Sequence, residues 1–178
     1  KKEIFLKYNV VTKIDNYLFL KTDFQVDYKI NNKLALLLST SGSTGNPQVV
    51  KLTYDNLSHN AKSICKSLKI TKDDVAITSL PLSYTYGLSI INSHFFAKGK
   101  IVVTDKSVIT REFWKLIKKF KVTNLGGVPF TYEMLKKIGF EKMNLPSIRY
   151  LTRAGGKLSE ELVKEFKKIC FKKKIKFF

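Results

Sequence analysis

The residues best suited to chemistry form a short run of hydroxyls and glycines. They are Thr40, Ser41, Gly42, Ser43, Thr44 and Gly45. Glycines allow positive φ and close approach of the backbone to a ligand, while successive N–H groups and hydroxyls can donate hydrogen bonds to phosphate oxygens. A plain surface turn has the same composition, so both readings stay open at this point.

Two better-known loops are excluded by the neighbouring residues. A Walker loop needs Lys and then Ser or Thr directly after its second glycine, but Gly45 is followed by Asn46-Pro47. A nucleophile elbow needs glycine two residues before its serine, and Ser41 stands at that position before Ser43. No catalytic residue is therefore assigned from these patterns.

The longer stretch carries a specific resemblance. Residues 40–47, followed by Leu52-Thr53-Tyr54-Asp55-Asn56-Leu57, resemble the nucleotide loop of the adenylate-forming superfamily, the AMP-dependent synthetases and ligases such as acyl-CoA synthetases. The resemblance implies that residues 40–45 hold the β- and γ-phosphates of ATP while a carboxylate attacks the α-phosphate, which yields an acyl-adenylate. The family usually has Lys-Gly after the proline, but this chain has Gln48-Val49 and offers only Lys51 as a substitute cation.

Three later segments are similar to substrate-binding segments of the same family: residues 81–88, 126–129 and 153–158. Pro81 to Leu88 is similar to the acyl-pocket segment, with Tyr84 at the common histidine position and Ser83 where an aromatic residue is usual. The resemblance places Tyr84 and Val128 beside the acid. It places Gly155, Gly156 and Lys157 beside the adenine and the acyl group. An ordinary, partly buried tyrosine remains the alternative reading of Tyr84.

The resemblance also implies partners and limits. It implies ATP and Mg²⁺, a carboxylic acid, and coenzyme A or the phosphopantetheine of an acyl carrier protein. In the family, an aromatic-Gly-x-Thr-Glu motif serves ATP and its magnesium, and a later domain supplies a catalytic lysine; the 178 residues lack these motifs. We therefore expect a fragment of an ATP-dependent carboxylate ligase, with no metal ligands of its own and inactive alone. The alternative is a non-catalytic module that binds an acyl group, a nucleotide or a protein.

The net charge of +19 raises the question of nucleic acid, because clustered cations release counterions from phosphate backbones. Only Arg111, Arg149 and Arg153 are arginines, the residues suited to bidentate phosphate and base contacts, and the lysines are scattered. Solvated helix faces explain this charge better, so no nucleic-acid partner is expected. A polybasic nucleic-acid binder stays as a third hypothesis.

The cysteines and the hydropathy pattern bear on metal binding, on disulfides and on the cellular location of the protein. Cys65 and Cys170 are far apart in the sequence and form no CxxC pair, which argues against zinc and against a disulfide framework. A reduced, cytoplasmic location is the default for such a chain. No apolar run approaches the ~20 residues of a membrane span, so we expect no membrane-spanning segment.

The elements that must position these residues alternate between strands and helices. We expect α/β architecture, a mostly parallel sheet with helices on both faces, and Gly-rich turns that converge at the carboxyl ends of buried strands. Residues 1–33 form a short-strand lead-in, and 34–178 form the nucleotide-loop part of an AMP-binding domain, ending before the Thr-Glu motif. Predicted strands cover 4–6, 10–14, 17–20, 34–38, 49–52, 75–79, 100–103, 122–125, 148–152 and 175–178. Predicted helices cover 53–69, 88–97, 110–120, 131–138 and 159–170.

Overall fold

The computed structural model describes residues 8–14, 17–22, 29–39 and 48–178, and its contacts divide the chain into units 1–32 and 33–178. In the first unit, β1 (Tyr8–Ile14) pairs antiparallel with β2 (Tyr17–Thr22), so the strands expected over 10–14 and 17–20 are present. The expected strand over 4–6 and the turn at 15–16 lie outside the described residues.

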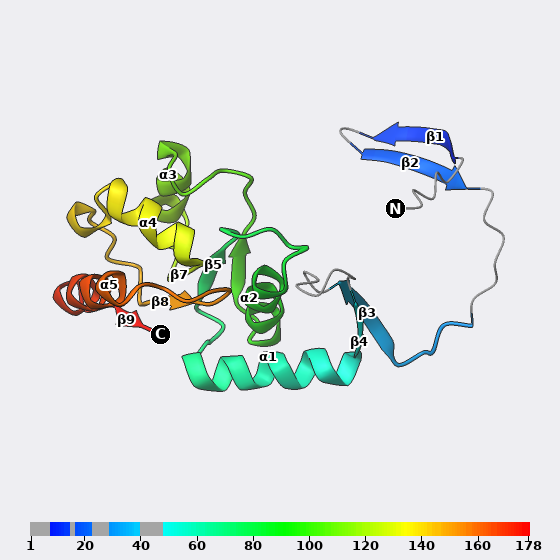
Figure 1. Cartoon of the computed structure of the whole chain (residues 1–178), viewed down its shortest axis with the longest axis horizontal. Helices are drawn as coiled ribbons and strands as arrows, with labels where there is room; N and C mark the ends of the chain where they lie inside the picture. The colour runs from blue at the N-terminus through cyan, green and yellow to red at the C-terminus, as the bar shows by residue number, and fades with distance from the viewer. Residues whose placement is uncertain (1–7, 15–16, 23–28, 40–47) are drawn as a thin grey trace. The chain divides into compact units, whose positions relative to one another are not determined.

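The second unit is built on parallel strands (Figure 1). They are β5 (Val75–Ile77), β6 (Lys100–Val102), β7 (Asn124–Gly127), β8 (Tyr150–Arg153) and β9 (Lys176–Phe177). Parallel ladders join β5 to β6 and run through β7, β8 and β9 in that order. The Thr123 amide donates to the Val75 carbonyl at 2.8 Å and so joins the two ladders. The expectation of a mostly parallel sheet is confirmed.

Helices cover both faces of these strands. They are α1 (Tyr54–Leu68), α2 (Thr85–Phe96), α3 (Arg111–Lys119), α4 (Pro129–Lys137) and α5 (Glu160–Lys172), with a short 3-10 turn, η1 (Phe140–Lys142), after α4. Helix α2 packs on β5 and β6 and is itself covered by α1, whereas α3, α4 and α5 share the main core on the other face. The α/β class is therefore confirmed.

Polar side chains cap three helices at the residues where the predicted helices begin. Thr53 Oγ1 accepts a hydrogen bond from the Asn56 backbone amide, and the Thr53 backbone amide donates one to Asn56 Oδ1, which forms a capping box ahead of α1. Thr110 and Ser159 cap α3 and α5 in the same way. Such a cap is worth about 1 kcal/mol, so short local motifs fix where these helices begin.

The strand that leads into the 40–45 loop differs from the expectation of a buried, parallel strand. β3 (Leu34–Ser39) pairs antiparallel with β4 (Val49–Thr53) in a two-stranded hairpin. The side chains of β3 are at best half-buried, and Leu37 is 54% exposed. A hairpin with no further described strand beside it can bury only the face that meets α1, which explains the exposure.

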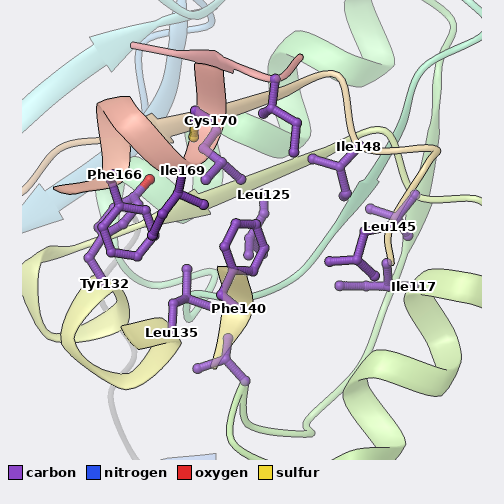
Figure 2. Packing of buried hydrophobic residues seen from close by; sticks show 14 of the residues in the cluster. Ile117, Leu125, Tyr132, Leu135, Phe140, Leu145, Ile148, Phe166, Ile169 and Cys170 are labelled. Carbon is purple, nitrogen blue, oxygen red and sulfur yellow. The ribbon is translucent and has the colours of Figure 1, made fainter. Parts of the chain in front are cut away.

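The main core lies under α3, α4 and α5. Figure 2 shows Tyr132, Phe140 and Phe166 turned toward one another, and the Tyr132 and Phe166 rings meet edge to face with centroids 5.0 Å apart. Phe113 and Ile117 of α3 are fully buried, as their spacing predicts. Phe120, the C-cap of α3, is 45% exposed.

Candidate functional site

Three of the residues predicted to form the site lie together. Tyr84 is the N-cap of α2, Val128 is the N-cap of α4, and Gly155 follows β8 in the left-handed region at φ +78. A Cβ on Gly155 would overlap the Tyr84 hydroxyl and would lie 3.1 Å from Val128 Cγ1. The tyrosine hydroxyl therefore covers the glycine, and the valine methyl borders the same spot.

The ends of β7 and β8 hold this cluster in place. The Ala154 amide donates to the Gly127 carbonyl at 3.3 Å, just beyond the last paired residues of the ladder. Gly156 faces the ring of Pro129, where an added Cβ would lie 3.1 Å from Cγ. The two glycines thus let the turn after β8 pack tightly against the start of α4.

Lys157 is exposed. The six residues of the phosphate loop, Thr40, Ser41, Gly42, Ser43, Thr44 and Gly45, lie outside the described residues. Lys51, the candidate substitute cation, is exposed in the middle of β4.

Tyr86 and Thr152, which were not among the predicted site residues, line a cavity near the cluster. The Tyr86 hydroxyl donates to Thr152 Oγ1 at 2.6 Å and packs over Gly126, where a Cβ would lie 3.1 Å from that hydroxyl. Burial raises the pKa of Tyr86, so its hydroxyl stays neutral. Because the expected helix began at residue 88 and α2 begins at Thr85, the direction of the Tyr86 side chain could not be predicted.

The cavity has a volume of about 400 Å³, within the range of small-ligand sites. It lies between α1, α2 and β8. Its lining residues are Ser63, Ile64, Ser67, Leu68, Ile70, Tyr86, Ser89, Ile90, Ser93, His94, Asn124, Tyr150, Thr152, Arg153 and Phe178. The wall combines four aliphatic side chains with hydroxyl groups of serine, threonine and tyrosine.

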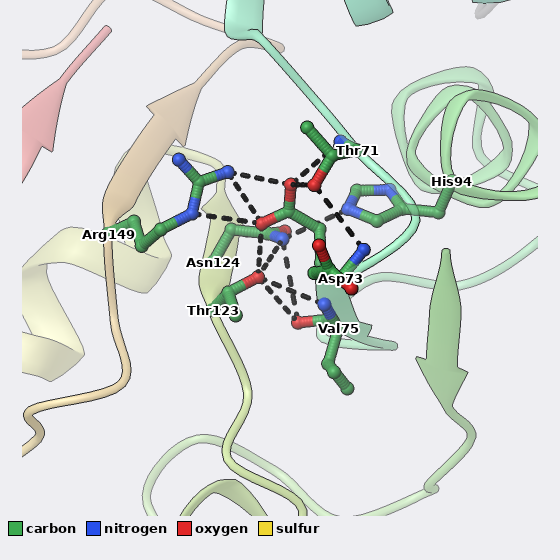
Figure 3. A network of polar contacts seen from close by, with 8 residues as sticks. Thr71, Asp73, Val75, His94, Thr123, Asn124 and Arg149 are labelled. Carbon is green, nitrogen blue, oxygen red and sulfur yellow. Dashed lines mark hydrogen bonds and ion pairs between the residues drawn. The ribbon is translucent and has the colours of Figure 1, made fainter. Parts of the chain in front are cut away.

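A buried polar network lies at the opposite ends of the same strands (Figure 3). Asp74, just before β5, is 1% exposed and accepts hydrogen bonds from Arg149 Nη2 at 2.6 Å, from Thr123 Oγ1 at 2.7 Å and from the Thr71 amide at 2.9 Å. Burial by itself would raise the pKa of the Asp74 carboxyl, but these hydrogen bonds outweigh it and hold that pKa below its usual range. Asp74 is therefore a structural anion.

His94 extends this network as a neutral ring. It is 2% exposed, and its Nδ1 lies 2.7 Å from the Ile90 carbonyl while its Nε2 lies 3.0 Å from the Asn124 amide nitrogen. A ring that donates from Nδ1 and accepts at Nε2 satisfies both partners. Burial lowers the pKa of His94, which agrees with a neutral ring that has a structural role.

No metal centre is formed in the part of the chain that the structure describes. There, no three His, Cys, Asp or Glu side chains lie together in a way that could hold an ion. In the same residues, no helix combines the length and the apolar character needed to cross a membrane.

Comparisons with known proteins identify relatives of the chain. The family model for "AMP-binding enzyme" matches residues 9–176. Marinolic acid–CoA ligase of Pseudoalteromonas sp. (strain SANK 73390) is 28% identical over 71% of this chain and 21% of its own length. 2-Succinylbenzoate–CoA ligase of Staphylococcus epidermidis is 30% identical over 78% of this chain and 29% of its own length. The chain thus spans less than a third of either relative.

A solved structure agrees with these relatives. O-succinylbenzoate coenzyme A synthetase (MenE) from Bacillus subtilis, in complex with ATP and magnesium ion, is 26% identical and has a TM-score of 0.68. The match covers 79% of this chain and 28% of that protein. The same enzyme has also been solved with the acyl-adenylate intermediate OSB-AMP, and that structure gives a TM-score of 0.69 at 27% identity.

Proposed function

The chain belongs to the AMP-binding enzyme family, and on that basis we propose that it is the nucleotide-loop part of an ATP-dependent acid–thiol ligase. In this proposal, the protein that contains the chain activates a carboxylic acid as its acyl-adenylate and transfers the acyl group to a thiol. The matched relatives are CoA ligases for different acids, which supports the reaction type but leaves the acid to be argued from this chain's own residues.

The observation that carries the proposal is the meeting of Tyr84, Val128 and Gly155. Because Gly155 has no side chain, the Tyr84 hydroxyl and the Val128 methyl can lie directly against the turn after β8. Tyr84 and Val128 supply an aromatic face and a methyl group beside it, as the wall of an acid site requires. We assign the acid's carboxylate to this spot and the adenine to the Gly155-Gly156 backbone and Lys157.

We assign the phosphates of ATP to the hydroxyl-rich loop at residues 40–45, on the basis of its sequence. Its hydroxyls and backbone amides would bind the β- and γ-phosphates, so that the α-phosphate faces the carboxylate. Magnesium would neutralise phosphate charge in such a reaction. Among the described residues, no three His, Cys, Asp or Glu side chains lie together to hold an ion, so we assign no magnesium ligand and no magnesium-dependent step to this chain.

We propose coenzyme A as the thiol acceptor, because the two relatives described above are named as CoA ligases. The pantetheine arm of an acyl carrier protein has the same reactive thiol and is the alternative acceptor. We also propose a cytoplasmic location, which the two unpaired cysteines, Cys65 and Cys170, support.

The nucleotide site can be tested on the 178-residue chain by calorimetric titration with ATP. We expect Gly155→Ala to weaken ATP binding about tenfold or more, because the added methyl would collide with the Tyr84 hydroxyl and displace the turn. Gly139→Ala is the matched control: Gly139 has a similar φ of +73, but nothing lies within 4 Å of an added Cβ. Equal effects of the two changes would show that the Gly155 turn does not contact the nucleotide.

The reaction itself is tested with the complete protein that carries this chain. We expect exchange of labelled pyrophosphate into ATP that depends on an added carboxylic acid, and no exchange by the 178-residue chain alone. Binding of ATP without exchange by the complete protein would favour the non-catalytic binding module. Absence of both ATP binding and exchange would refute the proposed function.

A further inference from the structure

Helix α5, at one edge of the second unit, turns an aromatic side chain out to solvent (Figure 1). Phe171 is 87% exposed, the largest fraction among the exposed large hydrophobic side chains of the described residues. In the same part of the chain, no aromatic ring packs on it and no cationic group lies over it, whereas Lys119 Nζ lies 5.3 Å from the centroid of the Phe120 ring. Single exposed hydrophobic residues are common on protein surfaces, so the surroundings of Phe171 decide whether it marks a contact site.

Lysines surround Phe171. Residues three and four apart lie side by side on a helix, which places Lys167 and Lys168 one turn before Phe171. Lys164 lies one turn further back, and Lys174 follows the end of the helix, where its backbone amide donates to the Phe171 carbonyl at 3.1 Å. All four lysines are exposed, and none of their ammonium groups forms an ion pair or hydrogen bond with another described residue. We call these four lysines and Phe171 the Phe171 face.

Acidic side chains do not neutralise the Phe171 face. Residues 164–174 contain six lysines and one glutamate. That glutamate, Glu165, is paired with Lys136 of α4 at 2.6 Å. Glu160 and Glu161 lie in the first turn of α5, at the opposite end of the helix. The exposed ring of Phe171 is therefore set in a surface of unpaired positive charge.

We propose that the Phe171 face binds the surface of a membrane that contains anionic lipids. The other side of α5 is buried in the main core through Leu162, Phe166 and Ile169, so the helix is fixed and presents this face as a unit. The ring enters the boundary between headgroups and acyl chains, and the lysine ammonium groups stay beside the lipid phosphates. Cytoplasmic leaflets carry negative charge, so the proposed cytoplasmic location gives access to such a surface. This membrane contact does not depend on the proposed ligase activity.

The composition of this face favours a bilayer over a nucleic acid. The three arginines of the chain, Arg111, Arg149 and Arg153, all lie outside α5, and guanidinium is the group suited to bidentate contacts with single phosphates. Single-stranded nucleic acids stack successive bases on several aromatic side chains, but this face has one ring. A bilayer needs only diffuse positive charge and an apolar group that can enter it, and the Phe171 face has both.

The test is co-sedimentation with lipid vesicles of the complete protein that carries this chain. Vesicles of phosphatidylcholine and phosphatidylserine supply an anionic surface, and vesicles of phosphatidylcholine alone supply a neutral one. We expect binding to the anionic vesicles to be about tenfold tighter or more, because each lysine close to such a surface contributes about fivefold. Added salt should weaken this binding, because it screens the attraction.

Two variants of the Phe171 face test which residues make the contact. The double variant Lys167→Glu, Lys168→Glu should weaken binding to the anionic vesicles about tenfold or more, because it places negative charge beside the ring. Phe171→Ala should weaken it about fivefold, because it removes the group that enters the lipid. All three side chains are exposed, so we expect both variants to fold, which circular dichroism checks.

Each variant has a matched control on another helix. Lys62→Glu, Lys66→Glu changes the net charge by the same amount at two exposed lysines of α1. Phe95→Ala removes a ring that is 66% exposed on α2, a helix without lysine. Both controls should bind the anionic vesicles as wild type does, because exposed charges act over only about 8 Å at physiological salt and Phe95 has no lysine in the preceding turns.

Several outcomes would overturn the membrane contact. It is wrong if the protein binds neither kind of vesicle, if it binds both equally, or if the control variants lose as much binding as the variants of the Phe171 face. It is also wrong if the protein binds single-stranded RNA more tightly than anionic vesicles and the Phe171 face variants weaken the RNA binding, because the face is then a nucleic-acid site. Acid-dependent pyrophosphate exchange should be unchanged in all four variants, so a failure of the ligase proposal is seen separately from a failure of the membrane contact.

Discussion

Asp74→Asn is the substitution whose effect the structure defines most sharply. Asn has the same shape, but it places an NH₂ group where a carboxylate oxygen accepts from Arg149 and either Thr71 or Thr123. The variant therefore loses the ion pair with Arg149, and its NH₂ group faces another hydrogen-bond donor where an acceptor is needed. The network joins the segments before β5, β7 and β8, so the loss falls on the main core.

The magnitude follows from burial. Removing one partner of a buried pair costs about 3–5 kcal/mol. The Arg149 side chain is 47% exposed, so water can hydrate its charge once Asp74 is gone, which places the loss near the lower limit, about 3 kcal/mol. That is a large share of the ~5–15 kcal/mol by which domains are stable.

Urea unfolding followed by circular dichroism measures this loss. Asp73→Asn is the matched control, because Asp73 is the adjacent carboxylate and is exposed. We expect the control to stay within about 0.5 kcal/mol of wild type, as surface changes usually do. A loss below about 1 kcal/mol in Asp74→Asn, or equal losses in the two variants, would refute the structural role of the network.

The stability difference between wild type and Asp74→Asn should also depend on pH. The folded-state pKa of Asp74 is lowered, so its ionised form contributes stability above the unfolded pKa of ~3.9, and that contribution disappears as pH falls through the folded pKa. The stability gap between wild type and Asp74→Asn should therefore narrow below about pH 4. A gap that is unchanged from pH 7 to pH 3 would contradict this sign.

Two further predictions use matched substitutions. Phe166→Ala should lower the free energy of unfolding by about 3–5 kcal/mol because Phe166 is fully buried, whereas Phe171→Ala in the same helix, at a position 87% exposed, should change it by less than about 0.5 kcal/mol in urea unfolding. Tyr132→Phe should lower the free energy of unfolding by about 1–3 kcal/mol, because it leaves the Thr152 carbonyl without its donor at 2.7 Å. Tyr150→Phe should be neutral or stabilising, because it removes a buried hydroxyl that has no partner among the described residues. Thermal unfolding of both variants checks this, and equal losses of stability would contradict it.

Local sequence signals predicted much of the fold. The predicted helices that begin at Thr53, Thr110 and Ser159 are present, and each of these residues accepts a hydrogen bond within its own first turn, an interaction that needs no distant partner. The alternation of short apolar runs with helical periodicity likewise predicted the parallel strands. These features depend on neighbours a few residues away, so the sequence alone is sufficient for them.

Pairing between distant segments was harder to predict. The apolar run at 34–38 reads equally well as a central parallel strand or as one strand of a hairpin, because the hydrophobic pattern does not state which strand lies beside it. Its antiparallel pairing with β4 depends on tertiary contacts that the local pattern does not contain. The contribution of Tyr86 and Tyr150 to the cavity was missed for the same reason: both meet residues far away in the sequence.

The candidate site itself depends on strand register. The network at Asp74, Thr123 and Arg149 ties together the residues just before β5, β7 and β8. From there the β7–β8 ladder runs in register for four residues, so Val128 and Gly155 emerge beside each other at the far ends. A slip of one residue would turn every side chain of β8 to the opposite face and separate them. The buried ion pair at one end of these short strands therefore helps to position the Gly155 turn at the other end.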